Sequence, residues 1–270
     1  MYKRQPRILA GIDVAVDRLS PDGGDDAAAA IMTTDTVPKT AAVTIDGFTV
    51  GGMAKGAGML APSLATMLVV VTTDAAVNQD QADQALREAC SLTFDRIDSD
   101  GCMSTNDTVF LLASGASGVT PEPVVFADAV TRVCADLARQ LIADAEGASK
   151  DIEVCVDAAA SVEDAVAVGR AVTRSNLLKC AIHGEDPNWG RVLSAIGTTD
   201  AVFEADAVDV AINGVWVCTS GSIGASRDLV DMSGRTVRIS IVLHAGAERA
   251  TLWTNDLTAE YVHENSAYAT

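Results

Sequence analysis

The stretch KGAGMLAPSLATMLVVVTTDA, residues 55–75, decides how this chain is interpreted. Its first half is rich in Gly with one Pro, which is typical of a loop. Its second half is an apolar run rich in Val, which predicts a buried strand. One polar residue, Thr66, follows Ala65 at the junction of the two halves. Thr at the start of a strand is usually structural, so a catalytic role for its hydroxyl needs further support.

Composition places the chain among globular α/β proteins. It has 270 residues, of which 49% are hydrophobic and only 4% aromatic. Its net charge of −18 would repel a phosphate backbone, so we exclude nucleic acid as a partner. No run of about 18 apolar residues occurs, and we therefore expect no membrane span.

Six cysteines are widely spaced and form no C-x-x-C pair, so neither a zinc site nor a thioredoxin motif is indicated. Cys134 and Cys155 lie within apolar patterns and are expected to be buried, reduced thiols. No secretory signal is visible, and we expect a cytoplasmic protein. The first five residues, MYKRQ, match the translated end of a transposon sequencing adaptor read from a GTG start. We interpret them as a sequencing scar and the chain as truncated at its N-terminus.

Frequent hairpins among alternating helices and strands predict mixed α+β layers with mainly antiparallel sheets, not a parallel doubly wound sheet. Asp46-Gly47 and Asn213-Gly214 are the two hairpin turns. Gly147 is expected to cap a helix, residues 183–192 to form a turn, and residues 8–20 carry only a weak pattern. The remaining expected helices are 25–32, 78–97, 121–147, 161–182 and the start of 258–270. The remaining strands are the second half of the stretch 55–75, which begins at Thr66, and 108–115, 151–159, 236–246 and 249–257.

Several common functional motifs are absent. The glycine-rich residues 51–59 lack the Gly-Lys-Ser/Thr ending of a P-loop. The three histidines, His183, His244 and His263, do not have the spacing of a metal site. A Ser-His-Asp triad is left open, although no G-x-S-x-G motif supports one.

The chemistry of Thr66 gives its position a possible purpose. A threonine hydroxyl is a poor nucleophile until a base removes its proton. Cleavage of the Ala65–Thr66 bond would make Thr66 an N-terminal residue, whose own α-amino group has a reference pKa of about 7.7–8.0 and can act as that base. The small Ala65 and the Gly/Pro loop before it suit an attack by the Thr66 hydroxyl on the preceding carbonyl.

Five blocks occur in an order that resembles the ornithine acetyltransferase family, also called bifunctional glutamate N-acetyltransferase. The resemblance extends from about residue 26 to the end of the chain. The blocks are MTTDTVPK (32–39), GGMAKGAGMLAPSLATML (51–68), STNDTV (104–109), GEDPNWGR (184–191) and ENSAYAT (264–270).

The resemblance implies an N-terminal-nucleophile-like, self-cleaving acetyltransferase of arginine biosynthesis. Cleavage would leave residues 1–65 as part of an α chain and residues 66–270 as the whole β chain. Thr66 would take the acetyl group of N2-acetylornithine as an ester and pass it to glutamate in a ping-pong cycle. The family uses no metal or organic cofactor, some members also accept acetyl-CoA, and its chains assemble as (αβ)2.

The same resemblance places the substrate contacts. Lys55 would pair with the α-carboxylate, Glu146 with a cationic amine, and Asn265 offers donors and acceptors. The segment GEDPNWGR could be a structural turn or a wall of the site. The full set of expected site residues is Ala65 and Thr66 at the cleaved bond, with Thr33 or Thr34, Lys55, Thr66, Glu146, Asn265 and Thr270 on the substrate.

One departure and two alternatives remain. The family's Ser-Thr-Gly block, which supplies the oxyanion hole, does not precede Thr66 here, and loss of one such donor typically lowers a rate by about 10²–10³-fold. One alternative is therefore an inactive fragment. The other is an amidase or aminopeptidase of related fold, which would pass the acyl group to water.

Overall fold

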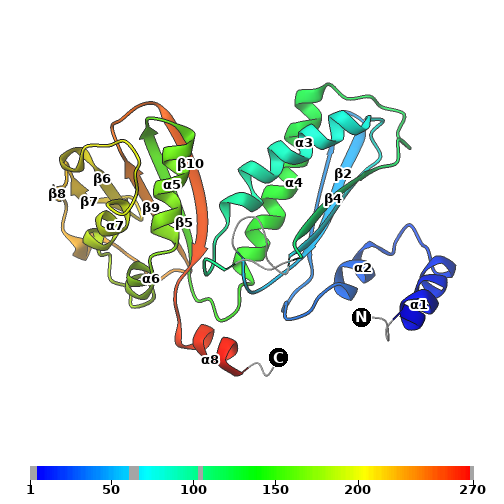
Figure 1. Ribbon diagram of the computed structural model, residues 1–270, viewed down its shortest axis with the longest axis horizontal. Coiled ribbons are helices and arrows are strands. Elements are labelled where there is room, and N and C mark those ends of the chain that lie inside the picture. Colours follow the sequence, from blue (N-terminus) through cyan, green and yellow to red (C-terminus); the bar gives the residue numbers. More distant parts are fainter. Residues whose placement is uncertain (1–4, 61–66, 103–105, 268–270) are drawn as a thin grey trace.

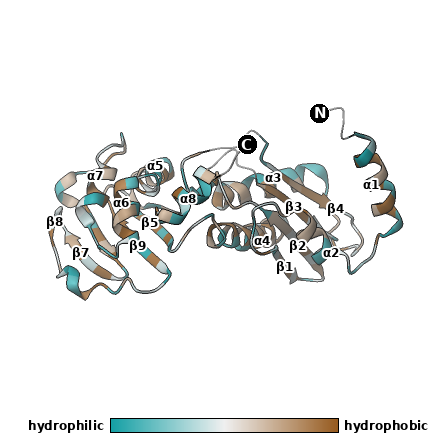
Figure 2. Ribbon diagram, turned by 90° about the horizontal axis from the view of Figure 1, so that it is seen from below, coloured by the Kyte–Doolittle hydropathy of each residue, from teal (hydrophilic) through white to brown (hydrophobic). Residues whose placement is uncertain are grey.

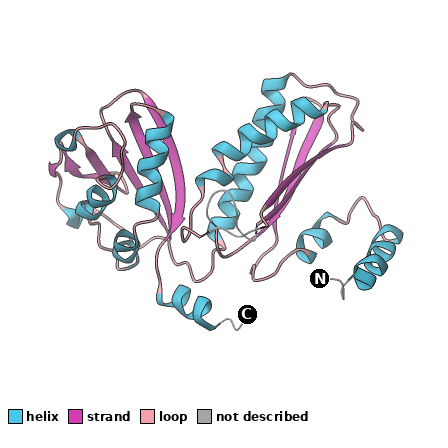
Figure 3. Ribbon diagram, in the orientation of Figure 1, coloured by secondary structure: helices cyan, strands magenta, loops and turns pink. Residues whose placement is uncertain are grey.

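The computed structural model of the chain describes residues 5–60, 67–102 and 106–267. They form two lobes, each a β-sheet with helices against it, which lie side by side in Figure 1. Helices and strands are distributed through both lobes (Figure 3), and six of the eight strand pairings are antiparallel. The expected mixed α+β layers with mainly antiparallel sheets are confirmed.

The first lobe is a four-stranded sheet in the order β1-β2-β3-β4, in which only β3 and β4 are parallel. The long helix α4 lies across β1 and β2, and α3 packs beside α4. Helices α1 and α2 precede this sheet. The bounds are α1 (Gln5–Asp17), α2 (Gly24–Ala30), β1 (Lys39–Ile45), β2 (Phe48–Lys55), β3 (Leu68–Thr73), α3 (Gln79–Leu92), β4 (Thr108–Ala113) and α4 (Pro123–Ala143).

The second lobe is a six-stranded sheet in the order β10-β5-β9-β6-β7-β8. Helices α5, α6 and α7 contribute to its apolar core, and α8 ends the described chain below the lobes in Figure 1. The bounds are β5 (Asp151–Ala159), α5 (Val162–Thr173), α6 (Asn176–His183), α7 (Trp189–Ile196), β6 (Asp209–Ile212), β7 (Val215–Thr219), β8 (Ser222–Ile223), β9 (Thr236–Val242), β10 (Glu248–Asn255) and α8 (Ala259–Ala267).

Both predicted hairpins are confirmed. Asp46 and Gly47 have φ of 48° and 84°, and Asn213 and Gly214 have φ of 47° and 83°. Two consecutive positive φ angles define the turn whose twist matches that of the paired strands, and Asp-Gly and Asn-Gly suit it. The first turn sets the register of β2 against β1, in which Ala54 lies opposite Lys39. Lys55 therefore lies at the edge of the sheet where β1 begins.

The core of the first lobe depends on a glycine in the middle of β2. A Cβ at Gly52 would lie 3.1 Å from Leu137 and 3.2 Å from Val133 of α4. The absence of a side chain therefore lets the helix approach the sheet closely. Cys134, on the same helix, is fully buried, and burial raises the pKa of its thiol to about 12. All six cysteines are free, and Cys134 and Cys155 are buried as expected.

Three local predictions are wrong. Residues 161–182 form two helices, because the Ser175 side chain accepts the Leu178 N–H and starts α6. The expected turn at 183–192 is present only at residues 184–188, because α7 begins at Trp189 and Asn188 caps it by accepting the Arg191 N–H. Helix α4 ends at Ala143, so Gly147 does not cap it.

The N-terminal helix α1 was not predicted from its weak pattern. None of its residues is buried, and Figure 2 shows it standing apart from both lobes with apolar residues on its surface. The described residues include no helix that is both long and apolar enough to cross a membrane.

Candidate active site

Lys55 is a buried cation at the end of β2. Its side chain is enclosed, with only 3% of the residue exposed, and its Nζ donates to Thr33 Oγ1 at 3.2 Å. Among the residues that the structure describes, no carboxylate lies within ion-pair distance of it. A buried charge is unfavourable unless it is paired. Lys55 is therefore suited to receive an anionic group from a ligand.

The other buried lysines show what a satisfied ammonium looks like in this protein. Lys39 meets two carboxylates. Lys150 donates to Glu185 and to two backbone carbonyls. Lys179 donates to the Ser99 carbonyl and the Thr254 hydroxyl, and burial lowers the pKa of its ammonium. Lys55, with one described hydroxyl partner, differs from all three.

A buried ionic network places Thr33 next to Lys55. Asp35 accepts the N–H of Thr33 at 3.1 Å and the N–H of Gly56 at 2.7 Å. Lys39 Nζ joins Asp35 at 2.7 Å and Asp144 at 2.6 Å. Burial raises the pKa of Asp35, but these hydrogen bonds outweigh it and hold that pKa below its ordinary value. One carboxylate thus holds both the Thr33 loop and the residue after Lys55.

Glu146 contacts the segment that follows Lys55, at Ala57 and Gly58. Its N–H donates to the Ala57 carbonyl at 2.8 Å. A Cβ at Gly58 would lie 2.6 Å from Glu146 Oε2, so any other residue at 58 would displace the Glu146 carboxylate from its present position. Glu146 and Thr34 both line a pocket of about 270 Å³, together with Glu264 and Arg235.

Helix α8 is held against the Glu146 segment. The Thr258 hydroxyl donates to the Gly147 carbonyl at 2.6 Å, and Gly147 has φ of 65° with no space for a Cβ against the Tyr261 backbone. The Tyr261 hydroxyl donates to Asp100 at 3.3 Å, and burial together with that carboxylate raises the pKa of Tyr261 to about 12. These contacts bring the C-terminal helix to the pocket.

The predicted site residues are therefore brought together only in part. Thr33 contacts Lys55, whereas Thr34 lines the pocket with Glu146. Asn265 is exposed on α8, and its side chain donates to the Tyr261 carbonyl of its own helix at 3.0 Å. Three predicted residues, Ala65, Thr66 and Thr270, lie outside the described residues.

Sequence reasoning missed Asp35 and Lys39, which position the site without being predicted to touch substrate. Both lie in the block MTTDTVPK, so the signal was present. An Asp and a Lys four residues apart beside a Pro are usually exposed to solvent. Their burial becomes visible only in the folded chain, where Asp144, far along the sequence, joins them.

Ser149, His183 and Asp256 lie together but do not have the geometry of a catalytic triad. His183 Nδ1 lies 2.9 Å from Asp256 Oδ2, and the Ser149 hydroxyl contacts the same oxygen. A triad needs the serine on the opposite imidazole nitrogen, Nε2. Asp256 also accepts the N–H of Lys150 at 2.8 Å, which makes this cluster a structural anchor. The described residues contain no cluster of His, Cys, Asp and Glu able to hold a metal ion.

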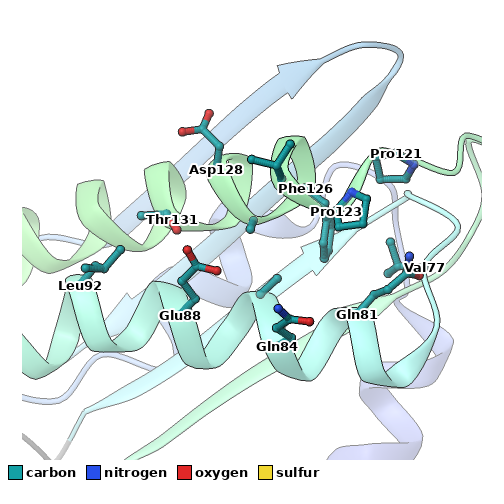
Figure 4. Close-up of a pocket in the computed structure, with 13 residues that line it drawn as sticks. Val77, Gln81, Gln84, Glu88, Leu92, Pro121, Pro123, Phe126, Asp128 and Thr131 are labelled. Atoms are coloured by element: carbon teal, nitrogen blue, oxygen red, sulfur yellow. The ribbon is translucent and has the colours of Figure 1, made fainter.

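A groove of about 560 Å³ lies between α3 and α4 (Figure 4). Figure 4 shows Gln84 and Glu88 of α3 facing the groove from one side and Phe126 and Thr131 of α4 from the other. None of the predicted site residues lines it, so we do not assign it to the reaction.

Comparisons with known proteins identify the family to which this fold and sequence belong. The model of the ArgJ family matches residues 3–270. The arginine biosynthesis bifunctional protein ArgJ of Streptomyces avermitilis is 68% identical over 97% of this chain and 69% of its own length. The protein of that name from Thermobifida fusca is 61% identical over 98% of this chain and 69% of its own.

A crystal structure of the arginine biosynthesis bifunctional protein ArgJ from Bacillus halodurans is also similar. It shares 35% identity and a TM-score of 0.69 over 74% of this chain and 98% of that one. The fold and the sequence thus agree on one class, the acyltransferases of arginine biosynthesis. The chain belongs to the ArgJ family, which confirms the family resemblance.

Proposed function

We propose that this protein moves the acetyl group of N2-acetylornithine to glutamate through an ester on Thr66, after cleavage of the Ala65–Thr66 bond. The observation that carries this proposal is the buried ammonium of Lys55, which has no carboxylate partner among the described residues and lies eleven positions before Thr66. Both substrates supply an α-carboxylate that Lys55 can bind.

The pocket beside Lys55 suits the rest of the donor. N2-acetylornithine carries a cationic amine at the end of its side chain, and Glu146 offers a carboxylate in a pocket that Thr34 also lines. Asn265 and Thr270 of the C-terminal block would complete the set. Glutamate has a carboxylate where ornithine has its cationic amine, so Glu146 does not attract it. Lys55 therefore contributes more than Glu146 to the binding of the acceptor glutamate.

The chemistry follows from a free N-terminal threonine. Its α-amino group takes the hydroxyl proton while Oγ attacks the acetyl carbonyl, forming a tetrahedral intermediate. The intermediate collapses with cleavage of the carbon–nitrogen bond, and the ornithine α-amine leaves with the proton. The α-amine of glutamate then attacks the Thr66 ester, and the proton returns to Oγ. Each half-reaction conserves the acyl group.

The proposed cleavage divides the chain into residues 1–65, part of an α chain, and residues 66–270, the β chain. The matching chain of the Bacillus halodurans structure is about three quarters as long as this one, as is the segment 66–270. That length supports the division. From the family resemblance we further propose an (αβ)2 assembly. We also propose acetyl-CoA as a second acetyl donor, because the names of the relatives include the word "bifunctional".

Intact mass spectrometry with N2-acetylornithine tests the proposal in the protein expressed from its complete gene. We expect two chains separated between Ala65 and Thr66 and one added acetyl group on the chain that begins with Thr66. The Thr66→Ala variant should remain one uncleaved, inactive chain. Two chains in that variant would refute the role of Thr66, and release of acetate to water in place of transfer to glutamate would favour the amidase.

A further inference from the structure

Strand β3 begins at Leu68, and the residue before it, Met67, is held on three sides. Its N–H donates to the Asp107 carboxylate at 2.8 Å, and its carbonyl accepts the N–H of Thr108 at 3.1 Å. Gly56, the residue after β2, lies against its backbone, since a Cβ there would be 3.5 Å from the Met67 Cα. Met67 itself is buried.

The Asp107 contact is not part of the ordinary sheet. The parallel ladder between β3 and β4 begins at Leu68 opposite Thr108. The Met67 N–H precedes that register, and a side chain supplies its acceptor. Asp107 therefore extends the ordered pairing of β3 by one residue toward Thr66.

The Asp107 carboxylate is partly buried and lies near a second charged group. Burial raises the pKa of its carboxyl, while the Met67 N–H and the nearby Lys55 ammonium act against that rise. The same side chain is thus bonded to the residue after Thr66 and lies within electrostatic reach of the proposed substrate-binding cation. No other described carboxylate combines these two relations.

We infer that Asp107 is a positioning residue for the reaction, acting on Thr66 through the Met67 N–H. A peptide group is planar, so the N–H of one residue and the Cα of the residue before it share a plane. An acceptor fixed on the Met67 N–H therefore limits how the peptide group of Thr66 can turn. This inference rests on the proposed function, because it requires Thr66 to be the nucleophile.

The size of the expected effect follows from how steeply rates depend on alignment. A nucleophile displaced by about 1 Å can lose about 10²-fold in rate. In Asp107→Ala the Met67 N–H loses its acceptor, and we expect acetylation of Thr66 to slow by about 10–100-fold. In Asp107→Asn the amide oxygen can still accept that N–H, so most of the rate should return.

Asp74 offers a matched control at the far end of the same strand. Its carboxylate accepts the Thr49 N–H at 2.7 Å just beyond β3, so it performs the same backbone task. The six residues of β3 span about 20 Å, which separates Asp74 from the Met67 end of the strand. Asp74→Ala should lower the melting temperature without changing the acetylation rate of the folded, cleaved protein.

The experiment uses the cleaved fraction of each protein expressed from the complete gene. Single-turnover acetylation of Thr66 by N2-acetylornithine gives the rate, and steady-state assays give KM. We expect Asp107→Ala to lower the rate and kcat with KM changed by less than about threefold, and Asp107→Asn to restore the rate. The control, Asp74→Ala, should have the same single-turnover acetylation rate as the wild type.

Two results would overturn the inference. One is an Asp107→Ala rate equal to that of Asp74→Ala, which would make the contact merely structural. The other is an Asp107→Asn rate as low as that of Asp107→Ala, which would show that the hydrogen bond is not what matters. Failure of the proposed function is separate, because it would appear as wild-type protein that neither cleaves nor acquires an acetyl group.

Discussion

Replacement of Lys39 by Met should destabilise the protein strongly, although Lys39 is not expected to touch substrate. Its Nζ lies 2.7 Å from Asp35 and 2.6 Å from Asp144, and the Asp35 and Asp144 side chains are 0% and 8% exposed. The methionine would fill the space but leave two buried carboxylates facing each other without a cation. Breaking a buried ion pair by removing one partner typically costs about 3–5 kcal/mol.

That loss should lower the melting temperature by roughly 6–20 °C, taking about 2–4 °C per kcal/mol for a domain of this size. Thermal unfolding followed by circular dichroism measures it. Arg87→Met is the matched control, because Arg87 forms an ion pair with Asp83 in which both side chains are mostly exposed. We expect no measurable change in melting temperature there.

The pH dependence gives a second, sharper measurement. The pKa of Asp35 lies below its ordinary value, so Asp35 stabilises the wild type above its unfolded pKa, and that stability is lost as pH falls through the folded pKa. Removal of Lys39 takes away two of the interactions that lower the pKa of Asp35, its hydrogen bond and its charge, so this pKa is higher in the variant than in the wild type. The variant therefore gains stability relative to the wild type as pH falls. The difference in unfolding free energy between the wild type and Lys39→Met should therefore become smaller from pH 7 toward pH 4. A difference below about 1 kcal/mol at pH 7, or one independent of pH, would refute the reasoning.

Two further substitutions test the site. Lys55→Met should lower kcat/KM for both substrates by about 10–100-fold, because a hydrogen bond to a charged group contributes about 1.5–3 kcal/mol. It should not lower the melting temperature, since it removes a buried cation without a described counter-ion. Unchanged kcat/KM in steady-state assays would contradict the assignment. Gly58→Ala should raise the KM for N2-acetylornithine by displacing Glu146, whereas Gly234→Ala, where a Cβ meets nothing within 4 Å, should not; equal KM values in the two variants would contradict the contact.

The parts of the fold that depend on local chemistry could be predicted from sequence. The Asp46-Gly47 and Asn213-Gly214 turns require positive φ at both residues, and few other dipeptides provide it. The end of a helical pattern is harder to place. The break at Ser175 depends on one side-chain hydrogen bond to the Leu178 N–H, which apolar periodicity does not register.

The candidate site divides in the same way. Lys55 and Glu146 stood out only within a family motif, since an isolated Lys or Glu is usually a surface charge. Glu146 meets the segment after β2 through the Ala57 carbonyl, and the network beside Lys55 is completed by the contact between Lys39 and Asp144. Such contacts join segments about a hundred residues apart, which local sequence patterns do not reveal. Whether Thr33 or Thr34 lies beside Lys55 was beyond sequence reasoning, because both belong to the same short loop.

The order of strands in the first lobe has a consequence for the proposed cleavage. The bond between Ala65 and Thr66 lies between β2 and β3, which are antiparallel neighbours from Lys55 opposite Leu68 to Val50 opposite Thr73. Cleavage would therefore turn one polypeptide into two that share a single sheet. Separating them would expose the core face of α4, so the pair should stay joined without a covalent link. Once unfolded, however, the two pieces would have to find each other, and recovery would become a second-order process that depends on protein concentration.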